Sequence, residues 1–196
     1  MTQVGRSCPG DSPISKPASI FAFLADGAAS GLRGALVTIV GLEGGSPRSL
    51  GSHMAVLENG VAVGSLSSGC VEAAIRAEAV AAIAAGRSRA VKFGAGSPFI
   101  DIRLPCGGAM EILILVDPTR EIVARAAAAL TARTPVSLYM NSTGAFDFAE
   151  DQGRPTRWDD DLFVVRHVPS LKVVILGQGD EALAMMQLAR AFGAEA

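Results

Sequence analysis

Two cysteines stand in small-residue surroundings that suit chemistry. Cys70 follows the polar stretch 65–69, of sequence Ser-Leu-Ser-Ser-Gly, and precedes an Ala-rich segment whose apolar residues recur with helical spacing. The pattern predicts a strand over 61–63, a tight turn, and a helix that begins at or near Cys70. The first N–H groups of a helix have no intrahelical partner and carry partial positive charge, so they can hold an anion or favour a thiolate. The alternative is that Cys70 is a small buried hydrophobic residue.

A second cysteine, Cys106, lies between Pro105 and the pair Gly107-Gly108, just before the apolar run 112–116. It too has the alternative of a buried residue in a glycine-stabilised turn. A third small-residue segment, Gly-Gly-Ser-Pro-Arg-Ser-Leu-Gly over 44–51, contains Ser46 and Arg48. Two cysteines on glycine-rich loops, together with this segment, are an unusual set for one core.

These segments together resemble the XdhC/CoxI family of molybdoenzyme accessory proteins. The matching sequences are GGSPRSLGSHMAVLENG (44–60), VGSLSSGCVEAAI (63–75) and FIDIRLPCGGAMEILI (99–114), followed by KVVILGQG (172–179). The resemblance covers roughly residues 16–196. The first three segments are specific in combination, whereas the last is a weak signal alone.

The resemblance implies a maturation chaperone rather than an enzyme. Such a protein receives molybdenum cofactor (molybdopterin) as cargo, protects it while a sulfido ligand is installed, and hands it to a xanthine-dehydrogenase-type molybdoenzyme. The implied partners are that enzyme and a cysteine desulfurase. Glycine-rich backbone suits the phosphate of the cargo, Arg48 or Arg103 can add a bidentate clamp, and a thiolate suits the soft metal.

On that reasoning Cys70 is the first choice for a metal ligand and Cys106 the second. Glu72 can accept hydrogen bonds from the pterin, but a helix-capping or surface role is favoured. His53 is expected to be structural, and His167 is given no role. The predicted cofactor-binding residues are Ser46, Arg48, Ser68, Gly69, Cys70, Glu72, Cys106, Gly107 and Gly108.

Two other functions stay open at this point. The first is a thiol-dependent enzyme with Cys70 as nucleophile, although His53 and His167 are the only histidines that could supply its base. The second is an NAD(P)-binding oxidoreductase subunit, based on the Gly177-Gln-Gly-Asp-Glu-Ala182 sequence.

Composition limits the remaining possibilities. Of 196 residues, 49% are hydrophobic and 18% charged, and the net charge of −2 argues against a nucleic-acid surface. No apolar run approaches the roughly 18 residues of a membrane helix, and the first residues lack the apolar region of a secretory signal, so we expect a cytoplasmic protein. The three cysteines, at 8, 70 and 106, form no C-x-x-C pair, which disfavours a zinc ribbon or disulfide framework.

The order of elements predicts an α/β fold with an N-terminal mixed sheet. Asn59-Gly60 is a strong hairpin signal, and Asp117-Pro118 is expected to cap the helix that follows. The predicted helices begin near residues 17, 70, 118 and 180, and the predicted strands cover 35–42, 54–58, 61–65, 89–93, 99–104, 112–116, 136–140 and 172–176.

The C-terminal segment predicts the start of a Rossmann half that stays incomplete. Only 19 residues follow Gly177, too few for the second strand and its acidic residue, and Asp180 would repel a phosphate. NAD(P) binding is therefore not expected, and the exposed edge favours a homodimer. The expected organisation is a disordered tail (1–15), an XdhC/CoxI-like domain (16–140), a hairpin and linker (141–170) and a truncated Rossmann-like start (171–196).

Overall fold

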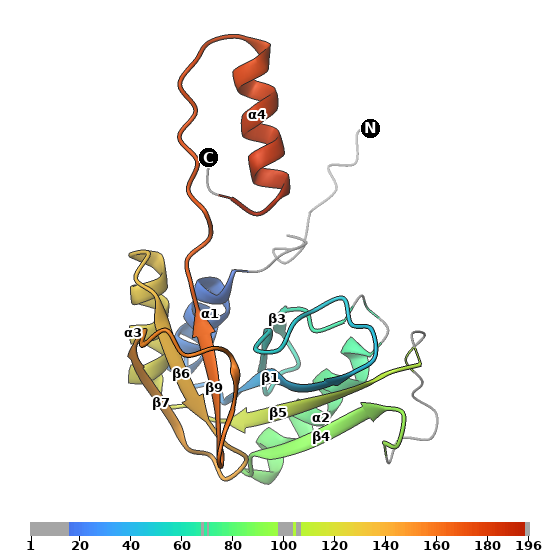
Figure 1. The fold of residues 1–196 in the computed structure, drawn as a ribbon. Coiled ribbons are helices and arrows are strands. Elements are labelled where there is room, and N and C mark those ends of the chain that lie inside the picture. The colour runs from blue at the N-terminus through green and yellow to red at the C-terminus, as the bar shows by residue number, and fades with distance from the viewer. Residues whose placement is uncertain (1–15, 68, 70, 98–103, 105–106, 195–196) are drawn as a thin grey trace, which may run out of the picture.

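The computed structural model describes residues 16–67, 69, 71–97, 104 and 107–194 (Figure 1). Within these residues the helices are α1 (Pro17–Ala29), α2 (Glu72–Ala85), α3 (Arg120–Thr131) and α4 (Asp180–Ala191). The strands are β1 (Gly34–Glu43), β2 (His53–Leu57), β3 (Ala62–Gly64), β4 (Arg89–Gly94), β5 (Ala109–Val116), β6 (Val136–Met140), β7 (Phe146–Glu150), β8 (Arg157–Asp159) and β9 (Leu162–His167).

A five-stranded sheet of order β3-β2-β1-β5-β4 forms the larger layer. The apolar run in β5 is buried on both faces: Leu113 and Leu115 pack with α1, whereas Ile112 and Ile114 pack with α2. This explains why β5 is nearly continuous in apolar residues rather than alternating. All strand pairings of this five-stranded sheet are antiparallel, whereas we expected a mixed sheet within the α/β fold.

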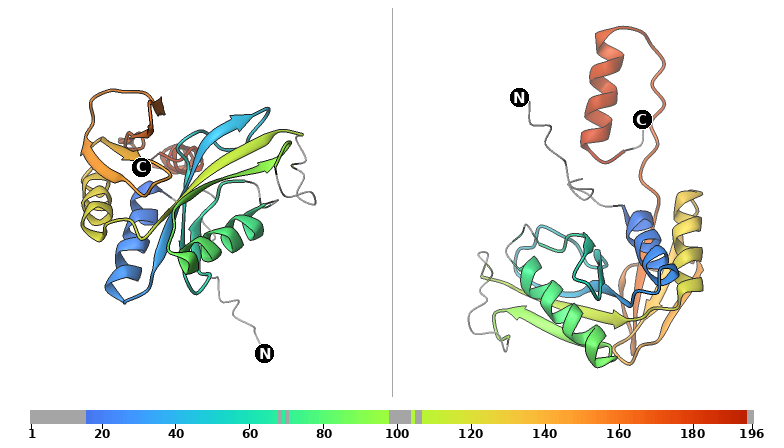
Figure 2. Two further views of the ribbon diagram at one scale, coloured as in Figure 1. Left: turned by 90° about the horizontal axis from the view of Figure 1, so that it is seen from below. Right: turned by 180° about the vertical axis from the view of Figure 1, so that it is seen from behind.

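A second antiparallel sheet, of order β7-β6-β9-β8, packs against α1 and α3. Phe21 of α1, Val123 of α3 and Phe163 of β9 share one buried cluster, so α1 lies between the two sheets (Figures 1 and 2). Three of its strands fall within 141–170, where we predicted only a hairpin and a linker. The polar composition there belongs to the turns. The short strands between the turns pair with one another and with β6: β7 and β9 pair with β6, and β8 pairs with β9.

A bulge in β1 ties the sheets together. The register of β1 against β5 shifts between Ile39 and Gly41, and the carbonyl of Val40 accepts a hydrogen bond from Trp158 Nε1 of β8 at 3.1 Å. A bulge takes one residue out of the ladder, and here its carbonyl is bonded from the other sheet.

The predicted turn at Asn59-Gly60 is confirmed, but the predicted cap at Asp117 is wrong. Gly60 has a φ of +80°, Asn59 Oδ1 accepts a hydrogen bond from Val61 N, and the flanking strands β2 and β3 pair antiparallel. The α3 helix begins at Arg120, because Asp117 takes a φ of +47° and directs its carboxylate to Arg33 at 2.7 and 2.8 Å instead.

The helix predicted near residue 180 is present as α4, but the strand predicted over 172–176 is not formed. Lys172 makes a single bridge, and the next residues run as an extended segment in which Val174 is 73% and Leu176 93% exposed. A strand needs a neighbour to hold its backbone groups, and among the described residues none pairs with this segment beyond that bridge. None of the described helices is long and apolar enough to span a bilayer.

Candidate functional site

The serine-rich turn before α2 is held by one carboxylate. Glu72 Oε1 accepts hydrogen bonds from Ser65 Oγ and from the Ser67 backbone N–H, each at 2.7 Å, and Oε2 accepts one from Ser67 Oγ. Burial is the largest single influence and raises the pKa of Glu72, but the hydrogen bonds from Ser67 and Ser65 together outweigh it, so the pKa lies below its ordinary value. Within the described residues Glu72 thus holds the turn before α2 rather than capping the helix, and its contact with the pterin stays a prediction.

The helix predicted at or near Cys70 begins at Glu72, with Val71 as the capping position. Gly69 is exposed and has a φ of +100°, which an L side chain rarely adopts. The predicted site residues Ser68 and Cys70 lie outside the described residues.

The second predicted turn is described from Gly107 onward. Gly107 has a φ of +71° and donates its N–H to the carbonyl of Leu104 at 2.9 Å. Gly108 is buried and contacts two other glycines: a Cβ at Gly94 would lie 2.3 Å from its carbonyl oxygen, and a Cβ at Gly44 would lie 3.2 Å from its Cα. Cys106 and Arg103 lie outside the described residues.

The segment 44–51 forms a loop bonded to itself and to β1. Ser46 Oγ accepts a hydrogen bond from the Arg48 N–H at 3.3 Å, and Gly51 donates to the carbonyl of Ile39 at 2.8 Å. Gly51 is buried with a φ of +79°, and a Cβ there would lie 2.8 Å from Val165 of β9. The loop is thus packed against the second sheet by a position that only glycine fits.

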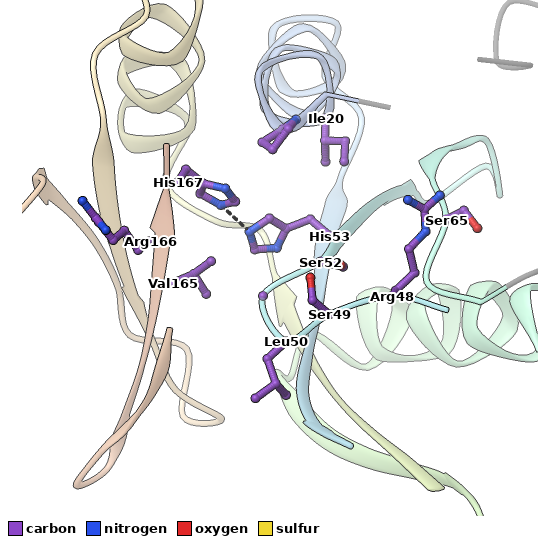
Figure 3. A pocket seen from close by; sticks show the side chains of 12 residues that line it. Ile20, Arg48, Ser49, Leu50, Ser52, His53, Ser65, Val165, Arg166 and His167 are labelled. Carbon is purple, nitrogen blue, oxygen red and sulfur yellow. Dashed lines mark hydrogen bonds between the residues drawn. The ribbon is translucent and has the colours of Figure 1, made fainter. Parts of the chain in front are cut away.

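A pocket of about 260 Å³ opens between this loop and the two sheets (Figure 3). Its lining includes Arg48 of the 44–60 segment and Ser65 of the 63–75 segment, so these two family segments meet at its rim. The contact of Gly44 with Gly108 brings the 99–114 segment to the 44–60 segment. The described parts of all three segments are therefore neighbours. The full lining is Pro17, Ile20, Arg48, Ser49, Leu50, Gly51, Ser52, His53, Ser65, Val165, Arg166 and His167.

Two buried histidines form one wall of this pocket. His53 Nε2 and His167 Nε2 lie 2.9 Å apart, His53 Nδ1 lies 2.8 Å from Thr38 Oγ1, and Phe21 packs against both rings. Burial, and secondarily the neighbouring His167, lowers the pKa of His53 well below its ordinary value, and burial lowers the pKa of His167 to about 4. Both rings are therefore neutral near pH 7.

The two histidines differ in how far the sequence indicates them. His53 begins β2 and is buried, as expected of a structural residue. His167, Ser49 and Ser52 were not predicted as site residues. His167 is 114 positions from His53, in a segment that we interpreted as a linker, so no local spacing pointed to it. The SPRSLGS loop itself was the available signal for the serines.

Among the described residues no group of three or more His, Cys, Asp or Glu side chains is arranged to hold a metal ion. The predicted metal ligands Cys70 and Cys106 are outside that range. Metal ligation by these two cysteines therefore stays a prediction.

Comparison with known proteins agrees with these motifs. Residues 27–94, which include the first two segments, match the model of the XdhC and CoxI family. Over this segment the chain is therefore similar to the XdhC and CoxI family. Among curated relatives, the molybdenum cofactor insertion chaperone PaoD of Escherichia coli (strain K12) is 34% identical over 175 residues. That match covers 89% of this chain and 55% of the relative, so the chain spans little more than half the length of PaoD.

The fold also has a solved counterpart. A crystal structure described as a xanthine dehydrogenase from Bacillus halodurans superposes with a TM-score of 0.70 at 20% identity. The match covers 91% of this chain and 60% of that protein. At this identity the similarity shows a shared fold, which confirms the α/β class.

Proposed function

We propose that this chain binds molybdenum cofactor as cargo and assists its sulfuration and insertion into a xanthine-dehydrogenase-type molybdoenzyme. The observation that carries the proposal is the convergence of the three family segments, with Gly44 against Gly108 and Arg48 beside Ser65 at one pocket. The relative named as a molybdenum cofactor insertion chaperone supports the same role.

The proposed site contacts the cofactor with two kinds of group, hydrogen-bond donors for its oxyanions and thiolates for its metal. The turns at Ser46 and Gly108 are proposed to offer backbone donors to oxyanions, and Arg48 adds a charge-assisted contact. Gly69 and Gly107, whose N–H groups bond to Ser67 Oγ and to the Leu104 carbonyl, are proposed to let the cargo approach the backbone closely. The thiolates of Cys70 and Cys106 are proposed for the soft metal centre or for sulfur transfer to it. Ser68 adds a hydroxyl, and Glu72 acts as a positioning residue through Ser65 and Ser67.

The proposed partners are a xanthine-dehydrogenase-type enzyme as recipient and a cysteine desulfurase as sulfur source. A homo-oligomer and a cytoplasmic location are part of the same proposal. The exposed apolar residues of 171–192, including Leu176 at 93% and Phe192 at 82%, support a further contact surface in that segment.

Cargo binding is tested by purifying the protein from cells that make the cofactor and measuring molybdenum and pterin per chain. We expect near-stoichiometric pterin in the wild type and strong loss in the Cys70→Ser, Cys106→Ser double variant. Cys8→Ser is the matched control, because Cys8 lies outside the three segments, and it should keep the wild-type content.

Wild-type protein without pterin would refute the proposed function. Equal pterin in the wild type and the double variant would refute the two thiols as ligands. Thermal unfolding of each variant establishes that loss of cargo is not loss of fold.

A further inference from the structure

The pocket between the two sheets is lined by groups that suit an anion. Its lining residues all belong to the described part of the chain, and none of them carries a carboxylate. Arg48 lines it, and serine residues 49, 52 and 65 surround it (Figure 3). Arg166 contributes less than its charge implies, because its guanidinium pairs with Asp151 at 2.7 to 2.9 Å and points away from the histidines.

The loop at the rim presents unused hydrogen-bond donors. Within the described residues, the N–H groups of Ser49 and Leu50 and the hydroxyls of Ser49 and Ser52 have no protein partner. Ser65 differs, because its hydroxyl donates within the turn that Glu72 holds. Adjacent backbone N–H groups in a turn form a concave cradle for anions, and the serine hydroxyls extend it.

The hydrogen bonds of the histidine pair decide the tautomer of each ring. Thr38 is buried, and His53 Nδ1 is the partner of its hydroxyl, so the arrangement that satisfies every buried group has Thr38 Oγ1–H donating to His53 Nδ1. His53 Nε2–H then donates to His167 Nε2, which leaves the proton of His167 on Nδ1. The pair is thus a neutral wall with a polarised N–H on His167.

Size and charge select the ligand. Pockets for complete drug-sized ligands occupy about 300–1,000 Å³, so a pocket of about 260 Å³ accepts a small group or the end of a larger molecule. A cation would be repelled by Arg48 and would find no carboxylate among the lining residues. Phosphoryl oxygens match the guanidinium, hydroxyl and N–H donors.

We infer that this pocket binds the phosphoryl or pyrophosphoryl end of the cargo, through Arg48, Ser49, Ser52 and the backbone of Leu50. The inference rests on the proposed function, because it takes that cargo to be a phosphorylated pterin. It also sets an orientation. Ser65 lines the pocket and is bonded to Glu72, so the phosphoryl end lies at the start of the turn that leads to Cys70.

Titration calorimetry near neutral pH, with inorganic pyrophosphate as probe, tests the pocket directly. Wild-type protein should bind pyrophosphate and bind inorganic phosphate more weakly, while sulfate at matched ionic strength gives the background. Arg48→Gln should weaken pyrophosphate binding about tenfold or more, and Ser52→Ala should weaken it several-fold. Arg87→Gln is the matched control, because Arg87 is exposed and outside the pocket lining, and it should bind as the wild type does.

Absence of pyrophosphate binding, or equal affinity in Arg48→Gln, Ser52→Ala and Arg87→Gln, would overturn the inference. Thermal unfolding of each variant identifies any that fails to fold. If Arg48→Gln does not fold, Ser52→Ala still tests the pocket. The pterin measurement separates the two proposals. Pyrophosphate bound in the pocket of a protein that never carries pterin would refute the function alone, and pterin bound with no effect of Arg48→Gln would refute the pocket alone.

Discussion

His53 Nε2 and His167 Nε2 meet at 2.9 Å and join the two sheets beside Phe21 of α1. The strands that carry them, β2 and β9, belong to different sheets, and both rings are more than nine-tenths buried. Protonation of either ring places a charge where burial opposes it, so this contact makes the joint between the sheets sensitive to acid.

Stability should fall as the pH drops from about 6.5 to about 4. In this range the unfolded histidines bind protons while folded His167, with a pKa of about 4, does not, so acid favours the unfolded state. The difference corresponds to about 3 kcal/mol for His167, with a further contribution of the same sign from His53. Urea unfolding at a series of pH values measures it. His167→Gln should be less stable at pH 7 and show a flatter pH dependence, and an unchanged slope would contradict the assignment.

Gly94→Ala should destabilise the protein more than Gly60→Ala. Both glycines have a φ near +80 to +90°, so both substitutions strain the backbone equally. Only at Gly94 would the new Cβ lie 2.3 Å from the Gly108 carbonyl, whereas Gly60 faces open space. We expect an excess loss of about 1–3 kcal/mol, measured by urea unfolding. Equal losses would mean that the Gly108 turn moves freely.

Glu72→Gln should loosen the serine turn. The variant keeps the size of the side chain but replaces a charged acceptor that receives three hydrogen bonds. We expect a loss of about 1–2 kcal/mol in the free energy of unfolding and faster amide exchange at Ser67. Glu121→Gln, on the exposed start of α3, is a matched control that should change stability by less than about 0.5 kcal/mol. Unchanged exchange at Ser67 would show that the turn does not depend on Glu72.

Asp117→Asn should cost about 1 kcal/mol, and Arg33→Ala no more than that. The two side chains are 45% and 41% exposed, so their ion pair is weak, but Asp117 Oδ1 also accepts the Gly34 N–H at 3.2 Å. Asparagine tolerates the positive φ of +47°, which isolates the loss of charge from backbone strain. A double-mutant cycle by urea unfolding should give a coupling energy below about 1 kcal/mol.

Removal of residues 171–196 should leave the rest of the fold intact. No residue of α4 is buried, and the preceding segment is largely exposed. Ser170 stays in the shortened chain, because its carbonyl accepts a hydrogen bond from Arg133 Nη2 at 2.6 Å. The midpoint of thermal unfolding should change by no more than about 2 °C, and a large drop would show that the segment packs on the body.

Local signals in the sequence predicted those elements whose cause is local. Asn59-Gly60 tolerates positive φ at the turn, and the apolar run in β5 requires cover on both faces, so both were predictable. Asp117 was misjudged because its carboxylate pairs with Arg33, 84 positions away. The strand predicted over 172–176 had the right composition, but within the described part of the chain nothing pairs with it beyond the bridge at Lys172.

The candidate site divides in the same way. The loops around Arg48, Glu72 and Gly107 were predictable from residue type and spacing. The pocket was not, because its wall combines His53 with His167 from a second sheet that sequence periodicity did not reveal.

Where Gly44 approaches Gly108, no side chain separates the two backbones. The loop that carries Arg48 and the turn at Gly107-Gly108 are therefore in direct backbone contact, and we expect a displacement of one to displace the other. A ligand that contacts both segments would then be bound and released by one movement of the two together.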